Sequence, residues 1–263
     1  MELNDKNYYT PEADKAYQSA SQFKEFHDKC PAEAIAKING WQEGDKRALG
    51  IGLYMDALWD GEEALNELML EARDKYFTKQ GKKRADVIAA DKAYMRAQTE
   101  PKMVEYMQGE HQRIFTGEIA GVPFKCKLDN FVEHDKIVDM KYMKDMQPSW
   151  DSQKHEYVTF IDKYSYARQL AIYQYLVSQA YGGELLPCYI ECITKEDPCD
   201  MAIIEIPQWK LNSELEVVKH YAPIYQEMKE GKREAPRCGH CEYCLETKEI
   251  TGPITYEELL KEI

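Results

Sequence analysis

Two acidic residues and a lysine are spaced so that they could bind a metal ion and activate a water molecule. Asp129 ends one segment with strand character, and the triplet Asp139-Met140-Lys141 ends a second such segment. Side chains alternate between the two faces of a strand, so Asp139 and Lys141 would project to the same face. If the two segments are neighbouring strands, their carboxylates and the ammonium group meet. Carboxylate oxygens hold hard divalent cations, which activate bound water.

The triplet alone leaves a second interpretation open. Charged residues make up 31% of this 263-residue chain, so two surface acids and a surface lysine at this spacing are common by chance. The elements that would position the three residues therefore decide between a metal site and a solvated surface.

The pattern of apolar residues predicts helices first and strands later. Ser19 is a predicted helix cap, and Pro31 after Cys30 suits the first turn of a further helix. The predicted helices cover residues 22–26, 32–38, 46–59, 62–77, 85–97, 157–181 and 209–229. The predicted strands cover residues 113–119, 123–129, 136–141, 185–194 and 201–206, with Ala120-Gly121 as the first turn.

This order of elements indicates an α/β protein with a helical N-terminal portion. We expect a single domain over residues 1–263. Its parts would be a mainly helical portion over residues 1–110, a catalytic core over 111–230, and a cysteine cluster with a tail over 231–263.

Composition restricts the location and the partners of the chain. No apolar run approaches the roughly 18 residues that cross a bilayer, and the N-terminus lacks the pattern of a signal peptide. We therefore expect a cytoplasmic protein without a membrane partner. The net charge of −13 argues against a passive nucleic-acid coat. An enzyme that acts on DNA needs only a local basic groove, so this charge does not exclude one.

Three of the eight cysteines form a dense motif near the C-terminus. Cys238, Cys241 and Cys244 have the spacing C-x₂-C-x₂-C, and Cys30 stands alone far upstream. Three thiolates at this spacing can face one metal ion or cluster, which then needs a fourth ligand. The remaining four cysteines lie in or beside apolar segments, where buried thiols are usual.

A helix downstream of the triplet completes a recognisable series. Gln169 and Tyr173 are four residues apart and would share one face of that helix. The order D…D-x-K…Q-x-x-x-Y resembles the PD-(D/E)XK nuclease superfamily, in its RecB-like branch. The resemblance runs from Ser19 to Cys244, and its opening residues look most like phage exodeoxyribonuclease VIII (RecE-type) nucleases. It implies a restriction-endonuclease-like core, in which helices flank a mixed central sheet.

The resemblance implies a role for each residue of the series. Asp129 and Asp139 would ligate Mg²⁺ or Mn²⁺, with the backbone carbonyl of Met140 as a further ligand. Lys141 would orient or help to deprotonate the attacking water and stabilise charge on the phosphate. Gln169 and Tyr173 would position the nucleic-acid backbone or support the metal ligands.

The chain departs from the RecB-like pattern at one position. Those enzymes usually carry a metal-binding histidine in an upstream Gly-x-x-x-His context, whereas the comparable stretch here runs from Gly52 to Asp56. A carboxylate can ligate Mg²⁺ in place of an imidazole. Alternatively, Asp56 changes the metal preference or only caps local structure. Glu118 on the first predicted strand is a further candidate ligand, with a surface carboxylate as its alternative.

The same resemblance suggests what the cysteine cluster holds. Cys30 resembles the N-terminal cysteine that, together with three C-terminal cysteines, binds a [4Fe–4S] cluster in some RecB-like and CRISPR-associated nucleases. Such a cluster would join the two ends of the chain and have a structural role. Zn²⁺ with His240 as a ligand, reduced thiols without a metal, and a redox centre are the alternatives.

The function implied by the resemblance is a metal-dependent DNA exonuclease of phage or prophage recombination. It would hydrolyse linear duplex ends and leave single strands for an annealing protein. Related nucleases often form rings, so a homo-oligomer is a further expectation. The alternative is a catalytically degenerate nuclease fold that binds DNA ends or a recombination partner.

Overall fold

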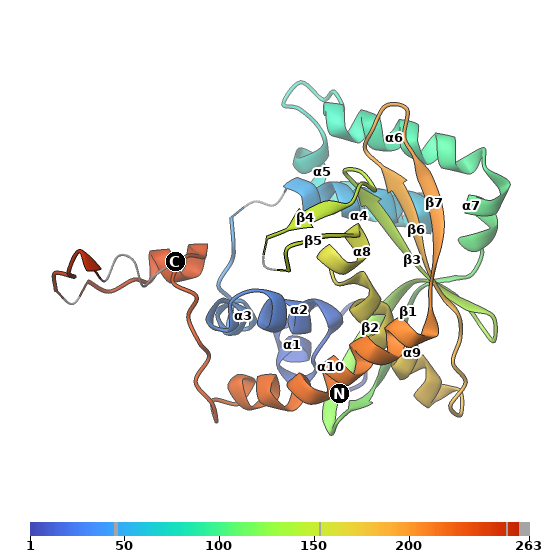
Figure 1. The fold of residues 1–263 in the computed structure, drawn as a ribbon. Coiled ribbons are helices and arrows are strands. Elements are labelled where there is room, and N and C mark those ends of the chain that lie inside the picture. The colour runs from blue at the N-terminus through green and yellow to red at the C-terminus, as the bar shows by residue number, and fades with distance from the viewer. Residues whose placement is uncertain (45–46, 153, 251, 258–263) are drawn as a thin grey trace. The chain divides into compact units, whose positions relative to one another are not determined.

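A five-stranded mixed sheet is the framework of this computed structural model, which describes residues 1–44, 47–152, 154–250 and 252–257 (Figure 1). The strand order is β1-β2-β3-β6-β7. The strands are β1 (Glu110–Ile119), β2 (Val122–Val132), β3 (Lys136–Met143), β6 (Cys188–Thr194) and β7 (Met201–Ile206). β3 pairs with β2 and β7 pairs with β6 in antiparallel fashion, whereas β3 and β6 are parallel. The predicted class, a mixed sheet flanked by helices, is confirmed.

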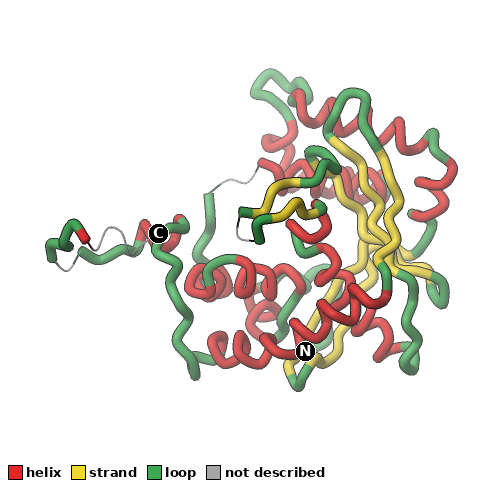
Figure 2. The backbone as a smooth tube through the Cα atoms, viewed as in Figure 1, coloured by secondary structure: helices red, strands yellow, loops and turns green. Residues whose placement is uncertain are grey.

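Helices dominate the chain before β1, as the sequence predicts (Figure 2). They are α1 (Pro11–Ala16), α2 (Ala20–Asp28), α3 (Pro31–Ile38), α4 (Arg47–Asp60), α5 (Glu62–Tyr76), α6 (Ala85–Gln98) and α7 (Pro101–Tyr106). The Ser19 side chain accepts a hydrogen bond from the Gln22 amide at 3.2 Å, which caps α2 as expected. Lys46, the predicted first residue of the fourth helix, lies outside the described residues.

Helices cover both faces of the sheet around β3. On one face, Val138 and Met140 of β3 belong to a hydrophobic cluster with buried residues of α4 and α6. On the other face lies α9 (Tyr166–Ala180), which approaches β1 so closely that a side chain at Gly117 would meet Leu176 at 3.1 Å. The residues of β3 that alternate with Val138 and Met140 therefore project toward the α9 face.

The segment before α9 differs from the single helix predicted over residues 157–181. A hairpin of β4 (Ser149–Asp151) and β5 (Glu156–Val158) precedes the short helix α8 (Phe160–Lys163), and α9 starts only at Tyr166. The prediction of one continuous helix was therefore wrong: residues 157–159, 164 and 165 are not helical, and residues 160–163 form the separate helix α8. Thr159 caps α8, and Ser165 adopts a left-handed conformation with φ 56° that separates the two helices.

The chain divides into two compact units. The first comprises Met1–Gly44, Glu118–Phe124 and Val218–Ile263, and the second comprises Asp45–Gly117 and Lys125–Val217. The first unit contains the end of α10 (Gln208–Lys229) and the short helix α11 (Glu242–Glu246), and the last six residues of the predicted tail lie outside the described residues. No helix in the described part of the chain is long and apolar enough to cross a membrane.

The N-terminal and C-terminal segments of the first unit are held together by polar contacts. The Lys229 ammonium group donates hydrogen bonds to the backbone carbonyls of Asp14 and Tyr17, each at 2.8 Å. The buried Gln18 amide donates to the Ala222 carbonyl at 3.0 Å. These bonds satisfy buried and part-buried backbone groups and therefore tie α10 to the first helices of the chain.

Candidate active site and metal centre

Asp129 and Asp139 lie on adjacent strands of the second unit. Asn130 of β2 pairs with Val138 of β3, so the two aspartates are the next residues beyond that pair on their strands. Asp129 Oδ2 accepts a hydrogen bond from the Met140 amide at 3.0 Å. Asp139 is almost completely buried, with 1% of its surface exposed. The structure thus brings together the two predicted carboxylates and the backbone of Met140.

Lys141 joins this group from the same face of β3. Its Nζ lies 2.5 Å from Asp139 Oδ2 and donates a hydrogen bond to the Met140 carbonyl at 3.2 Å. The ammonium group also lies 5.2 Å from the ring centroid of Tyr166. Lys141 therefore contacts the carboxylate and the carbonyl that the sequence assigns as oxygen ligands.

Gln169 and Tyr173 connect α9 to the same carboxylate. Gln169 Nε2 donates to Asp139 Oδ1 at 2.8 Å and to the Tyr173 hydroxyl oxygen at 2.8 Å. The two residues are one helical turn apart, which places both side chains on the face of α9 that covers β3. Asp139 is consequently held through both oxygens, by Lys141 on one and by Gln169 on the other.

Asp56 of α4 is electrostatically coupled to this centre. Burial raises the pKa of its carboxyl group to about 7, Lys141 lowers it, and the negative charges of Asp60 and Asp139 raise it. The residue that stands in the usual histidine position thus belongs to the same cluster of charges. Its side chain is half-buried, whereas that of Asp139 is almost completely buried.

Glu118 is the remaining predicted ligand. It is exposed on β1 and belongs to the first unit, whereas the acidic centre belongs to the second. Its role as a ligand stays a prediction, with a surface carboxylate as the alternative.

The four predicted cysteines do come together within the first unit. The sulfur atoms of Cys30, Cys238, Cys241 and Cys244 all lie within 4.8 Å of one another. Among the described residues, this is the one group of three or more metal-ligating side chains at such spacing. Cys30 is the N-cap of α3 and Cys241 is the N-cap of α11, so two helix starts deliver thiols to the same point.

Backbone amides are directed at these sulfur atoms. The Cys238 amide donates to Cys30 Sγ at 3.4 Å, the Cys241 amide to Cys238 Sγ at 3.3 Å, and the Cys244 amide to Cys241 Sγ at 3.5 Å. Amide donors stabilise thiolates, the form in which cysteine binds metals. The donor set therefore fits a metal ion or an iron–sulfur cluster.

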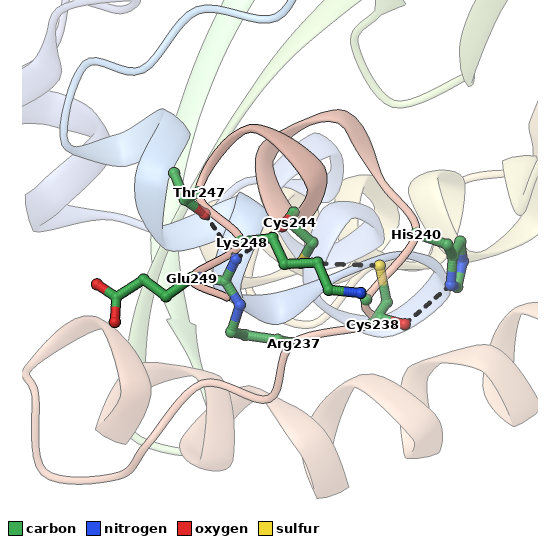
Figure 3. A pocket seen from close by; sticks show the side chains of 8 residues that line it. Arg237, Cys238, His240, Cys244, Thr247, Lys248 and Glu249 are labelled. Atoms are coloured by element: carbon green, nitrogen blue, oxygen red, sulfur yellow. Dashed lines mark hydrogen bonds between the residues drawn. The ribbon is translucent and has the colours of Figure 1, made fainter. Parts of the chain in front are cut away.

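His240 is not a member of the group of four sulfur ligands. Its Nδ1 lies 2.9 Å from the Cys238 carbonyl oxygen, and the side chain lines a pocket of about 610 Å³ next to the cluster (Figure 3). Arg237 lines the same pocket and donates to the Cys244 carbonyl at 3.0 Å. The sulfur group consists of the four cysteines without His240.

Comparison with known families now identifies the chain. Residues 19–247 match the model of a family described as a PDDEXK-like domain of unknown function (DUF3799). The chain belongs to this PDDEXK-like family. The matched region contains both the acidic centre and the cysteine cluster.

One solved structure agrees closely with the fold of this PDDEXK-like protein. The crystal structure of a "Putative exonuclease" from Eubacterium rectale is similar with a TM-score of 0.95 and 30% sequence identity, over 100% of both chains. The predicted restriction-endonuclease-like core is thereby confirmed. SSO0001 aligns with a TM-score of 0.32 and 12% identity over 82% of this chain and 92% of that chain, a likeness too low to support an argument. No curated protein matched the sequence.

The electrostatics of the PDDEXK-like centre favour a bound cation. Burial raises the pKa of Asp129 well above its usual range, and the negative charge of Asp139 raises it further. Burial disfavours the charged form of Lys141, but Asp139 and Asp129 more than compensate and raise the pKa of its ammonium group. A divalent cation would relieve the repulsion between the carboxylates.

Three residues around the centre were not singled out from the sequence. Asp60 lies one turn after Asp56 on α4, and its Oδ1 is 2.9 Å from Nδ1 of His111. The hydrogen bond to Asp60 is the main cause that raises the pKa of His111. The four-residue spacing of Asp56 and Asp60 was a sequence signal that could have identified Asp60, because residues four apart share one face of a helix. Tyr166 had none, because the predicted helix continued through it.

Proposed function

We propose that this PDDEXK-like chain is a metal-dependent DNA exonuclease that hydrolyses phosphodiester bonds at the ends of linear duplex DNA. The observation that carries the proposal is the buried Asp139, which is ion-paired with Lys141 and hydrogen-bonded by Gln169 beside Asp129. The description of the similar Eubacterium rectale protein as a "Putative exonuclease" supports the same activity.

The donor set of the centre suits Mg²⁺ or Mn²⁺. Asp129, Asp139 and the Met140 carbonyl would supply oxygen ligands, and Asp56 would supply a further carboxylate. Hard divalent cations prefer such ligands. When bound, the cation would lower the pKa of a coordinated water and neutralise charge on the phosphate.

The protein's own groups have distinct roles in this proposal. The Lys141 ammonium group stabilises negative charge that develops on the phosphate oxygens, because its contacts with Asp139 and Met140 hold it at the centre. Gln169 fixes the rotamer of Asp139 through Oδ1, and the Tyr173 hydroxyl group fixes Gln169 in turn. Both act as positioning residues in this scheme.

We assign the reaction to phage or prophage recombination of the RecE type. Support comes from the sequence order, which begins with the capped helix at Ser19 and continues through the acidic series to the cysteines. In this setting the cytoplasmic protein acts with a single-strand annealing protein and works as a homo-oligomer. The products would be single strands, which an annealing protein requires.

We also propose that the four cysteines hold a structural [4Fe–4S] cluster, with Zn²⁺ as the alternative. The compact sulfur group and its amide donors support a metal. Anaerobic purification followed by an absorbance spectrum and metal analysis distinguishes the two: a brown protein with visible charge-transfer bands contains iron, and a colourless protein with stoichiometric zinc contains the alternative. A protein that contains neither metal would overturn the proposal.

Digestion of end-labelled DNA tests the nuclease activity. The wild-type protein should degrade linear duplex in Mg²⁺ or Mn²⁺ and leave covalently closed circles intact. Asp139→Asn and Lys141→Ala should each abolish digestion, and cooperative thermal unfolding in EDTA would show that the fold survives. Full activity in both variants would contradict the assignment.

The same assay tests the alternative function, a catalytically degenerate nuclease fold that binds DNA ends or a recombination partner. This alternative is suggested by Asp56, which stands where RecB-like enzymes usually have a histidine. A wild-type protein that binds DNA ends but cleaves none in either metal would support a binding module. Asp56→His then provides a direct comparison, because it restores the side chain usual in RecB-like enzymes.

A further inference from the structure

A hairpin of the second unit exposes two large aromatic rings that the fold does not use. Trp150 of β4 and Tyr157 of β5 are directly opposite each other in the hairpin. Their ring centroids are 5.4 Å apart, yet 55% of Trp150 and 72% of Tyr157 remain exposed. Large contiguous exposed apolar patches mark interaction sites on soluble proteins.

This hairpin is linked to the acidic centre through α8 and two tyrosines. The hairpin leads through α8, which packs against β4, to Tyr164, which is 38% exposed. The Tyr164 ring lies 5.6 Å from the Tyr166 ring, and the Tyr166 ring lies 5.2 Å from Lys141 Nζ. The aromatic series therefore runs from the surface to the residue that contacts Asp139.

Lysines accompany the rings along the surface. Lys163 Nζ lies 5.6 Å from the Tyr164 ring centroid, and the exposed Lys154 is in the hairpin loop. Two nearby acids have local partners: Asp162 pairs with Lys210 at 2.8 Å, and Asp151 lies 4.0 Å from Lys154 Nζ, whereas Glu156 of β5 is exposed. The chain as a whole is acidic, with a net charge of −13, so a surface that combines aromatic rings with lysines differs from the average composition of the chain.

We propose that Trp150, Tyr157 and Tyr164 form a platform on which the bases of one DNA strand stack near the acidic centre. The inference rests on the proposed function and defines its substrate further. Stacking needs exposed base faces, so the platform selects a single strand over the body of a duplex. Every base has such a face, so binding is independent of sequence, while Lys154 and Lys163 contact phosphates.

The left-handed Ser165 lies between the last two tyrosines of the series. It separates Tyr164 at the end of α8 from Tyr166 at the start of α9, with φ 56° and ψ 33°. Such a conformation is uncommon for a residue other than glycine. It allows one tyrosine to remain exposed while the other turns toward Lys141.

Fluorescence anisotropy with labelled oligothymidylate in EDTA tests the platform without any cleavage. Trp150→Ala with Tyr157→Ala should weaken single-strand binding by about tenfold or more for each ring, whereas Trp150→Phe should retain most of the affinity. Tyr9→Ala is the matched control, because Tyr9 is 71% exposed and also packs edge-on against a ring, that of Tyr8. Its affinity should equal that of the wild-type protein.

Tryptophan emission gives an independent readout. Oligothymidylate should quench the wild-type protein and Tyr9→Ala but quench Trp150→Phe much less, since Trp150 is the ring that stacks. Equal affinity of the double variant and the wild-type protein would overturn the platform. So would a loss of affinity in Tyr9→Ala as large as in the double variant.

Asp139→Asn separates this inference from the proposed function. It should bind oligothymidylate with wild-type affinity while it fails to digest duplex DNA. Platform-dependent binding in a wild-type protein that never cleaves would disprove the exonuclease and leave the platform standing. Normal digestion together with unchanged binding by the double platform variant would disprove the platform alone.

Discussion

Gln169 of α9 donates a hydrogen bond of 2.8 Å to the buried carboxylate of Asp139 on β3. The two residues are 30 positions apart, and the bond leaves Asp139 Oδ2 directed at Lys141. A carboxylate held through both oxygens has its orientation fixed before a cation or substrate arrives. This preorganisation reduces the cost of rearrangement during catalysis.

Removal of the Gln169 amide should reveal how much the fixed orientation of the Asp139 carboxylate contributes to DNA digestion. We expect Gln169→Ala to lower digestion of linear duplex by about 10- to 100-fold and to raise the Mg²⁺ concentration for half-maximal activity. Tyr173→Phe should have a smaller effect in the same direction, because Gln169 keeps its bond to Asp139. The exposed Gln147→Ala serves as the control. Wild-type metal dependence in Gln169→Ala would show that the bond does not position the ligand.

Metal binding should release protons from Asp56. The pKa of this carboxyl group is raised to about 7 from an ordinary value of 3.8, so it is largely protonated in the folded protein at about pH 6. A cation must displace that proton, and its affinity should therefore increase as the pH rises through about 7. Calorimetry in two buffers with different ionisation enthalpies measures the release.

The variant Asp56→Asn should reduce this proton release, although Asp129 still contributes to it. The raised pKa of Asp56 also determines whether the stability of the folded protein rises or falls with pH. A proton bound more tightly by the folded protein stabilises it, so the metal-free protein should lose stability as pH rises from about 4 toward about 7. Equal proton release in Asp56→Asn and the wild-type protein would contradict the assignment of Asp56.

Glu191 of β6 should destabilise the protein at alkaline pH. It is completely buried, neither carboxyl oxygen has a hydrogen-bond partner among the described residues, and burial raises its pKa to about 8 from 4.5. The charged form is therefore disfavoured in the folded state, and stability should fall as pH rises from about 4.5 through about 8. Each unit of pKa shift corresponds to about 1.4 kcal/mol.

Chemical denaturation at several pH values measures this effect. Glu191→Gln should match the wild-type protein near pH 5 and exceed its free energy of unfolding by about 1 kcal/mol or more near pH 9. The exposed Glu205→Gln on β7 is the control and should follow the wild-type curve. Parallel curves for Glu191→Gln and the wild-type protein would refute the raised pKa.

The cysteine cluster should depend on its most distant ligand. Cys30→Ser replaces one thiol of the four, so we expect iron or zinc affinity to fall by about tenfold or more and thermal unfolding of the first unit to begin at lower temperature. Cys199→Ser changes a half-buried cysteine outside the cluster and should retain the metal. Retention of full metal content by Cys30→Ser would show that three cysteines suffice.

Periodic patterns in the sequence predicted the local parts of the site. The D-x-K spacing indicated one face of a strand, Q-x-x-x-Y one face of a helix, and Ser19 a helix cap, because each depends on residues within one turn or pleat. The hairpin of β4 and β5 was not predicted, because it depends on pairing between two strands and not on residues within one turn or pleat. Its cross-strand partners and the left-handed Ser165 interrupt the helix predicted through residues 157–165, of which residues 160–163 are helical.

By itself, the sequence determined which chemical groups the protein has and which of them share a face. Only the tertiary structure decided which groups meet: Cys30 with Cys244, Gln169 with Asp139, and Asp60 with His111. These pairs are separated by 30 to 214 residues, so no local periodicity relates them. Their contacts result from how buried helices and strands pack, and packing is a property of the whole chain.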